Sequence, residues 1–304
     1  MPDRVLRGSL KAGLRLFFKA PTRLPLPHTW LRRGMAALSN LGEQVSDREV
    51  QALSLEGVPC ERHGSSRASA VLYLHGGAFF AGSPRTHRVI GRALARALGA
   101  SVFLCDYRLA PEHPHPAALE DALAAWQGLL AMGYRPDQLI IAGDSAGGGL
   151  ALSLTLALRD QDQPLPLALL LVSPLVDLSL GSDAMRSMAA RDPMLSQALL
   201  ARAVDWYRGD LPADDPQLSP IQADLTSLPP MLIQVGSEEV LLDDALALER
   251  QARAAGVCVE CQIWPGLWHD FQLFQGLLPE AGLALEAMTR FIDAVFAGED
   301  PCLR

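Results

Sequence analysis

Short apolar runs alternate with longer helix-like stretches along the chain between residues 70 and 297. Runs of four to eight apolar residues suit buried strands, whereas the stretches between them are long enough for helices. The expected strands are Ala70–Leu74, Ser101–Asp106, Gln138–Ala142, Leu167–Val172, Met231–Val235 and Val257–Ile263, with a weaker edge hairpin over Val50–Leu55 and Val58–His63. The expected helices are Thr86–Leu98, Pro116–Met132, Ala146–Arg159, Leu241–Ala255 and Pro279–Phe296.

This alternation predicts an α/β fold with a mostly parallel central sheet flanked by helices, because strand–helix–strand crossovers join parallel strands. Two regions interrupt it, about residues 1–45 and 177–227, and the second contains expected helices at Ser182–Ser187 and Leu195–Tyr207. Insertions at the carboxyl ends of parallel strands lie above the place where such sheets bind ligands. We therefore predict a single domain, residues 1–304, in which these two regions form a helical cap.

The N-terminal segment has helical periodicity and an uneven charge. Residues 1–33 carry eight Lys or Arg against one acid, Asp3. An apolar face lies beside a basic stripe: Leu6, Leu10, Leu14 and Phe17 form the face, and Arg4, Arg7, Lys11, Arg15 and Lys19 form the stripe. Such a helix can lie on a membrane surface, but we favour a flanking helix whose apolar face packs on the body of the protein. A signal peptide is not expected, because charged residues interrupt the apolar stretch.

Composition and charge exclude several classes of protein. The chain has 304 residues, is 49% apolar and 20% charged, and carries a net charge of −8, so no nucleic-acid partner is expected. No run approaches the roughly 18 apolar residues needed to span a bilayer, which predicts a soluble protein without stable membrane insertion. Five scattered cysteines lack a framework spacing, and we expect reduced thiols and a cytoplasmic location. A metal or redox site at Cys258 and Cys261 is not favoured, because a strand would point their sulfurs to opposite faces.

One motif suggests nucleophilic catalysis. The segment Gly143–Gly148, Gly-Asp-Ser-Ala-Gly-Gly, follows an expected strand and precedes an expected helix. A serine between glycines at such a turn has its hydroxyl held clear of the backbone, above the free N–H groups of the helix N-terminus. The pattern also occurs by chance in ordinary loops, so the hypothesis that Ser145 is a nucleophile depends on partners elsewhere in the chain.

Candidate partners follow two later strands, whose carboxyl ends point to the same edge of the sheet as the Ser145 turn. A serine needs a base, and His269 follows the last expected strand. The base needs an orienting acid, and four carboxylates follow the strand before it, at positions 238, 239, 243 and 244. Asp243 and Asp244 fall where a helix begins, so spacing leaves Glu238 and Glu239 as equal candidates. The order serine, acid, histidine is that of α/β-hydrolases.

An oxyanion needs N–H donors in place before the reaction. The strand Ala70–Leu74 ends in His75-Gly76-Gly77, where paired glycines let backbone N–H groups face a substrate. With the N–H of Ala146, Gly76 and Gly77 supply three candidate donors. The substrate pocket is harder to predict, and its candidate lining residues, each more often found in a core, are Phe79, Phe80, Trp206, Tyr207 and Leu241.

Four ordered segments resemble the hormone-sensitive-lipase-like family of α/β-hydrolases: His75–Gly82, Asp106–Pro114, Gly143–Gly148 and Trp268–Phe271. The resemblance covers about residues 50–297. It implies an α/β-hydrolase fold with an N-terminal helical cap, and a carboxylesterase that acts on short-chain acyl esters without a metal or cofactor. Relatives in this family commonly form homodimers through the last strand and helix.

The resemblance also bears on single residues. Matching the family's acid motif, Asp-Pro-Leu-x-Asp, onto residues 239–243 implies that Glu239 is the catalytic acid, with glutamate in place of aspartate. Ala78 replaces the third glycine of the oxyanion motif. The segments around Glu239 and His269 also resemble bacterial esterases described as monoterpene ε-lactone hydrolases.

The sequence therefore predicts a serine carboxylesterase that acts through Ser145, His269 and Glu239. A lactone hydrolase with the same triad is the alternative. A ligand-binding relative without catalysis is a more remote one, because such proteins typically lack the histidine.

Overall fold

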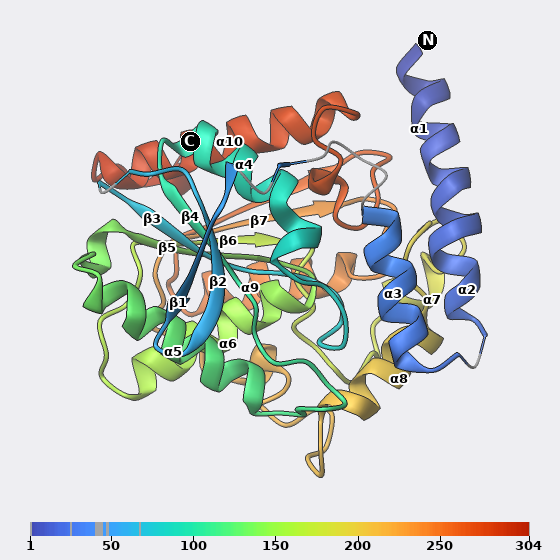
Figure 1. Cartoon of the computed structure of the whole chain (residues 1–304), viewed down its shortest axis with the longest axis horizontal. Coiled ribbons are helices and arrows are strands. Elements are labelled where there is room, and N and C mark those ends of the chain that lie inside the picture. Colours follow the sequence, from blue (N-terminus) through green and yellow to red (C-terminus); the bar gives the residue numbers. More distant parts are fainter. Residues whose placement is uncertain (1, 25, 40–44, 47–48, 67, 304) are drawn as a thin grey trace.

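The centre of the protein is one eight-stranded sheet, drawn as arrows in Figure 1. The computed structural model describes residues 2–24, 26–39, 45–46, 49–66 and 68–303. The strands are β1 (Gln51–Leu55), β2 (Val58–His63), β3 (Ala70–Leu74), β4 (Ser101–Cys105), β5 (Leu139–Asp144), β6 (Ala168–Val172), β7 (Met231–Gly236) and β8 (Val259–Trp264). They lie side by side in the order β1-β2-β4-β3-β5-β6-β7-β8.

The six strands β3 to β8 run parallel to one another, and β1 and β2 add an antiparallel hairpin at one edge, beside β4. The central strands β3, β4 and β6 are buried along their whole length, which explains why they appear in the sequence as continuous apolar runs. The expected mostly parallel sheet is confirmed, and every strand begins and ends within two residues of its expected range.

Helices cover both faces of the sheet (Figure 1). One face carries α4 (Arg88–Leu98) and α10 (Pro279–Phe296), and the other carries α5 (Ala117–Ala131), α6 (Ala146–Asp160) and α9 (Leu242–Ala254). Short 3₁₀ turns connect the elements: η3 (Pro84–His87), η4 (Pro136–Gln138), η5 (Pro220–Gln222), η6 (Phe271–Leu273) and η7 (Pro301–Leu303). Alternate residues of one strand serve the two cores, so Val71 packs towards α4 and α10 while Leu72 packs towards α5 and α6.

The two regions that interrupt the alternation lie together on one side of the sheet, at the right of Figure 1. The N-terminal region contains α1 (Pro2–Gly13), a π-helical stretch η1 (Leu14–Lys19), α2 (Ala20–Thr22) and α3 (His28–Ser39). The mid-chain region contains α7 (Asp183–Ser187) and α8 (Gln197–Tyr207). Hydrogen bonds join the two regions, as from Arg202 to the Leu24 carbonyl oxygen at 2.8 Å. Residues 1, 25 and 40–44 of the expected cap lie outside the described residues.

The orientation of the N-terminal helix differs from the expected one. Leu10 and Leu14 pack on the body, but Leu6 and Phe17 of the predicted apolar face are exposed. The basic stripe contacts the body instead, through the contacts of Arg7 with Glu280, Lys11 with Glu238, Arg15 with the Arg191 carbonyl oxygen and Lys19 with the Asp192 carbonyl oxygen.

The π-helical stretch explains part of this difference. A π-turn holds more residues than an α-turn, so side chains after Gly13 rotate away from the positions that a 3.6-residue period predicts. Phe18 therefore packs against the core in place of Phe17, and Lys19 is buried.

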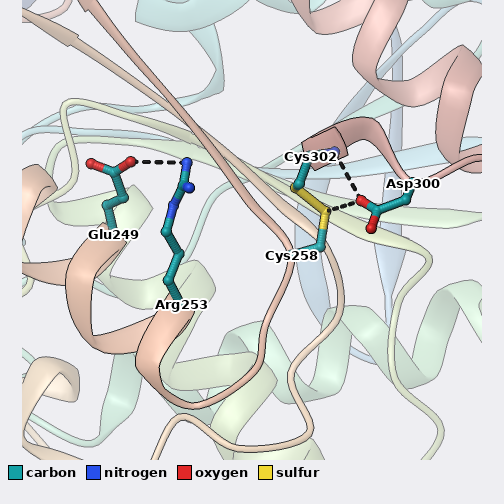
Figure 2. The surroundings of a disulfide bond; sticks show 5 residues. All are labelled: Glu249, Arg253, Cys258, Asp300 and Cys302. Atoms are coloured by element: carbon teal, nitrogen blue, oxygen red, sulfur yellow. Dashed lines mark hydrogen bonds and ion pairs between the residues drawn. A yellow bond between two sulfur atoms is a disulfide. The ribbon is translucent and has the colours of Figure 1, made fainter. Parts of the chain in front are cut away.

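The expectation that all cysteines are reduced is wrong for two of them. Cys258 and Cys302 form a disulfide, with their Cα atoms 5.8 Å apart (Figure 2). The bond ties η7 to the start of β8, and Asp300 accepts a hydrogen bond from the N–H of Cys302 at 2.9 Å. The 44-residue separation hides this pairing from any local spacing rule. Cys60, Cys105 and Cys261 are free thiols.

Within the described ranges, no helix is both long and apolar enough to cross a membrane.

Candidate active site

Ser145 lies at the turn between β5 and α6, as the motif predicts. Its backbone has φ 53° and ψ −122°, a strained conformation for a residue with a side chain. Surrounding bonds hold it there, because the Ser145 N–H donates to the Val172 carbonyl oxygen at 2.8 Å and its own carbonyl oxygen accepts from Leu175 N–H at 3.0 Å. The serine is therefore fixed by the end of the neighbouring strand β6.

Glycines on either side of Ser145 are required by the closeness of the chain. A Cβ at Gly143 would meet the carbonyl oxygen of Gly147, and a Cβ at Gly147 would meet that of Leu74. Neither backbone group can move without breaking the sheet or the first turn of α6. The steric explanation of the motif is therefore correct for this turn.

His269 and Glu239 form a buried pair at the ends of the last two strands. Nδ1 of His269 lies 2.9 Å from Oε2 of Glu239. Oε1 of Glu239 accepts from the Ser173 hydroxyl at 2.9 Å and also from the Gly236 N–H. Burial raises the pKa of Glu239, and the hydrogen bond from His269 opposes this shift.

Glu238, the other candidate left open by spacing, points away from the histidine. Its carboxylate pairs with Lys11 at 2.7 Å and is partly exposed. Of the two carboxylates, only Glu239 contacts His269, which agrees with the motif alignment.

A second carboxylate touches His269 on its other nitrogen. Oδ2 of Asp270 lies 3.0 Å from Nε2, and Asp270 itself has φ 54°. Burial lowers the pKa of His269, but the charges of Asp270 and Glu239 outweigh burial and raise it well above its usual value. Burial raises the pKa of Asp270 to about 7, against the opposing effect of His269. Among the residues that the structure describes, no hydrogen bond joins Ser145 Oγ to the His269 ring.

The glycine loop after β3 presents unpaired backbone donors. Gly77 has φ +122°, and the N–H groups of Gly76 and Gly77 have no hydrogen-bond partner among the described residues. The N–H of Ala146, the first residue of α6, has no acceptor inside its helix. Ala78 keeps a backbone N–H with φ 51° in place of the third glycine.

A buried polar network supports this loop from below. Asp144, next to Ser145, accepts from the Tyr73 hydroxyl at 2.7 Å and lies 3.2 Å from Nε2 of His87. A Cβ on Gly76 would meet the Asp144 carboxylate. The glycine loop after β3 and the serine turn are therefore in direct contact.

The candidate pocket residues separate into two groups. Phe79 stacks on Tyr207 with ring centroids 3.7 Å apart, and Phe80 meets Trp206 edge-on at 5.1 Å. These contacts bring the glycine loop against α8. Leu241 is fully buried in the core.

A surface pocket of about 240 Å³ lies beside Cys302, at the opposite end of β8 from His269.

Sequence reasoning missed Ser173 and Asp270 as contacts of the pair. Ser173 follows β6 directly, and its hydroxyl also accepts from the Asp270 N–H at 3.3 Å. A polar residue at the carboxyl end of a parallel strand is a signal that could have found it. Asp270 lies within the Trp268–Phe271 motif, but no spacing rule indicates its contact with Nε2 of His269.

Known proteins match this chain in sequence and in overall fold. The family model described as the alpha/beta hydrolase fold matches residues 71–273. The chain therefore belongs to the α/β-hydrolase family.

Individual relatives with more than a third of their residues identical to this chain are esterases or acetyl-hydrolases. An esterase from Acinetobacter venetianus is 38% identical over 91% of this chain and 93% of its own length. An acetyl-hydrolase from Streptomyces hygroscopicus is 42% identical over 86% of each chain. The crystal structure of an esterase from the bacterial hormone-sensitive lipase family superposes with a TM-score of 0.90 at 37% identity, over 96% of this chain and 98% of that one.

Proposed function

We propose that Ser145, His269 and Glu239 form a catalytic triad, with the N–H groups of Gly76, Gly77 and Ala146 as oxyanion donors. The chain is a carboxylic ester hydrolase, in keeping with the esterases it resembles. The observation that carries the proposal is the buried 2.9 Å contact between His269 and Glu239. The end of β6 connects this pair to the serine turn: the Val172 carbonyl oxygen accepts from the Ser145 N–H, and the hydroxyl of the next residue, Ser173, donates to Glu239.

Acylation follows from these positions. Nε2 of His269 takes the Ser145 proton as Oγ attacks the ester carbonyl carbon, and the carbonyl oxygen becomes an oxyanion between the three N–H donors. The tetrahedral intermediate then collapses, the alcohol leaves with the proton from Nε2, and an acyl-enzyme on Ser145 remains. Water then attacks the acyl carbon while Nε2 of His269 takes its proton; the Ser145–acyl bond breaks, Oγ regains the proton from Nε2, and the acid is released.

The proposed step requires Nε2 of His269 to face Ser145. In this structure Nε2 contacts Asp270 instead, at 3.0 Å. Turnover therefore includes an exchange of the Asp270 contact for a hydrogen bond to Ser145, which Glu239 permits because it holds the ring through Nδ1 alone. Hydrogen bonds of catalytic groups often tighten only when substrate is bound.

Replacement of Ser145 by alanine tests the nucleophile. We expect Ser145→Ala to abolish p-nitrophenyl butyrate hydrolysis and covalent labelling by a fluorophosphonate, while Ser179→Ala, an exposed serine of the mid-chain region, keeps both. Mass spectrometry should find the phosphonyl group on the peptide containing Ser145. Retained turnover in Ser145→Ala would overturn the proposal.

Short acyl chains are the proposed substrates. The stacked rings of Phe79 and Tyr207, with Phe80 against Trp206, fill space beside the glycine loop, which supports a small acyl group over a long one. The relative described as an acetyl-hydrolase agrees with this. Rates across p-nitrophenyl esters from acetate to palmitate should fall as the chain lengthens.

A lactone hydrolase remains the alternative, since a cyclic ester would use the same triad. Comparing kcat/KM for ε-lactones and linear esters separates the two activities.

We propose that residues 1–304 form one domain, with residues 1–45 and 177–227 as a cap over Ser145, and that the protein forms a homodimer through β8 and α10. Sedimentation velocity tests the oligomeric state. We also propose a cytoplasmic location, although the Cys258–Cys302 disulfide is more typical of an oxidising compartment. Cell fractionation, with thiol titration of the native protein, decides between them.

A further inference from the structure

A buried carboxylate outside the proposed triad reaches the loop that carries Glu239. Oδ1 of Asp192 accepts from the N–H groups of Met194 and Leu195 at 2.7 and 2.9 Å, which closes the turn before α8. Oδ2 accepts from the Val240 N–H at 3.1 Å. Val240 directly follows Glu239 in the chain, and Asp192 is fully buried. One side chain thus joins the mid-chain region to the backbone of the proposed acid.

An ammonium group from the N-terminal region meets the same turn. Nζ of Lys19 donates to the carbonyl oxygens of Ala189 and Asp192 at 2.6 and 2.7 Å, and Lys19 is only 5% exposed. Burial lowers the pKa of Lys19, and the Asp192 charge opposes this shift. A charge removed from water is costly unless it is paired and hydrogen-bonded. Hydrogen bonds to the two carbonyl oxygens, together with the opposite charge of Asp192, therefore stabilise the buried ammonium of Lys19.

We propose that Asp192 is a positioning residue for Glu239, and that Lys19 holds Asp192 in place, so that docking of the N-terminal helix completes the triad. The inference rests on the triad proposed above. Ser173 and Gly236 fix one carboxylate oxygen of Glu239, while Asp192 fixes the main chain on the other side of that residue. A misplacement of about 1 Å can cost roughly a hundred-fold in rate, so a lost anchor at Val240 should be visible in kcat.

Asparagine at position 192 isolates the proposed link. Its amide oxygen would keep accepting from Met194 and Leu195, because two N–H donors face that side. Its amide nitrogen would then face the Val240 N–H, and the bond to the acid loop would be lost. We expect Asp192→Asn to lower kcat for p-nitrophenyl butyrate by roughly 10- to 100-fold with little change in KM, because Asp192 contacts the acid loop and not the substrate.

A double-mutant cycle separates positioning from a general structural role. Asp192→Asn is measured in the native protein and in Glu239→Gln, with Ser145→Ala as the blank. If Asp192 acts through Glu239, its effect should shrink below about threefold once the acid is disabled, because residues that act as a unit are not additive. A structural role would lower both rates by the same factor.

Lys19 provides an independent test of the same link. Lys19→Met removes the ammonium, and we expect a smaller loss of kcat that also disappears in Glu239→Gln. Arg15→Met is the matched control, because Arg15 donates to the Ala190 and Arg191 carbonyl oxygens of the same turn from an exposed position. It should leave kcat unchanged.

The outcomes are distinguishable. Equal losses from Asp192→Asn in both backgrounds, or a wild-type kcat in the folded variant, overturn the positioning role and leave the triad intact. A near-native rate in Glu239→Gln alone overturns the triad itself. If Asp192→Asn does not fold, as judged by circular dichroism, Lys19→Met in the two backgrounds decides the question.

Discussion

Glutamine in place of Glu239 should slow ester hydrolysis by about 10⁴-fold, because the surroundings fix which way the new amide points. The Ser173 hydroxyl and the Gly236 N–H both donate to Oε1, so the amide oxygen would occupy that position and the NH₂ group would face Nδ1 of His269. Nδ1 must then accept, the ring proton moves to Nε2, and Nε2 can no longer take the Ser145 proton. Such a tautomer change costs about 10⁴ in kcat in serine proteases, or about 5 kcal/mol of barrier.

The assay is steady-state hydrolysis of p-nitrophenyl butyrate, with the folded fraction of each variant measured by circular dichroism so that folding losses are removed. Glu238→Gln is the matched control, because it removes a partly exposed ion pair with Lys11 worth no more than about 1 kcal/mol. We expect that control to change kcat less than about fivefold. Comparable losses in both variants, or a larger loss in Glu238→Gln, would refute the assignment of the acid.

Two further predictions concern groups near and far from the site. Asp270→Asn removes a negative charge beside Nε2 of His269, so the histidine should lose its proton more easily. The acid limb of the pH profile of kcat/KM should then move to lower pH, and an unchanged profile would contradict the proposed contact. Replacing Cys258 and Cys302 together by serine opens a 44-residue loop, which should lower the free energy of unfolding by at most about 4 kcal/mol. The midpoint of urea unfolding should fall while kcat stays unchanged, because the disulfide lies at the opposite end of β8 from His269; a lost kcat in the folded variant would contradict this.

The sheet and its helices could be predicted because each is determined by local patterns. β3 and β6 are apolar throughout, since both of their faces are covered, and α10 begins and ends at its expected residues. The partners of Ser145 could be proposed from chain order alone, because parallel strands bring their carboxyl ends to one edge of the sheet.

What could not be predicted depends on contacts between distant residues. The disulfide joins positions 44 residues apart, and the tail that carries Cys302 has no pattern of its own. The prediction of which face of the N-terminal helix packs on the body was wrong for two reasons. The π-helical stretch η1 changes the helical period, and the buried Lys19 donates to carbonyl oxygens 170 and 173 positions away. The sequence around Asp192 has no motif that indicates a positioning role for the same reason, since that proposed role depends on where Val240 lies in space.

The attachment of the first helix to a turn near position 192 also has a consequence in time. A ribosome adds roughly 5–20 residues per second, so the 173 positions between Lys19 and Asp192 represent roughly 9–35 s of synthesis at that speed. During that interval the helix has emerged, but the turn that receives it does not yet exist. Its outward Val5, Leu16 and Phe17 stay exposed even in the finished protein, and while the chain is nascent Leu10 and Leu14 have no body to pack on either, so the exposed apolar area of this segment is then at its largest.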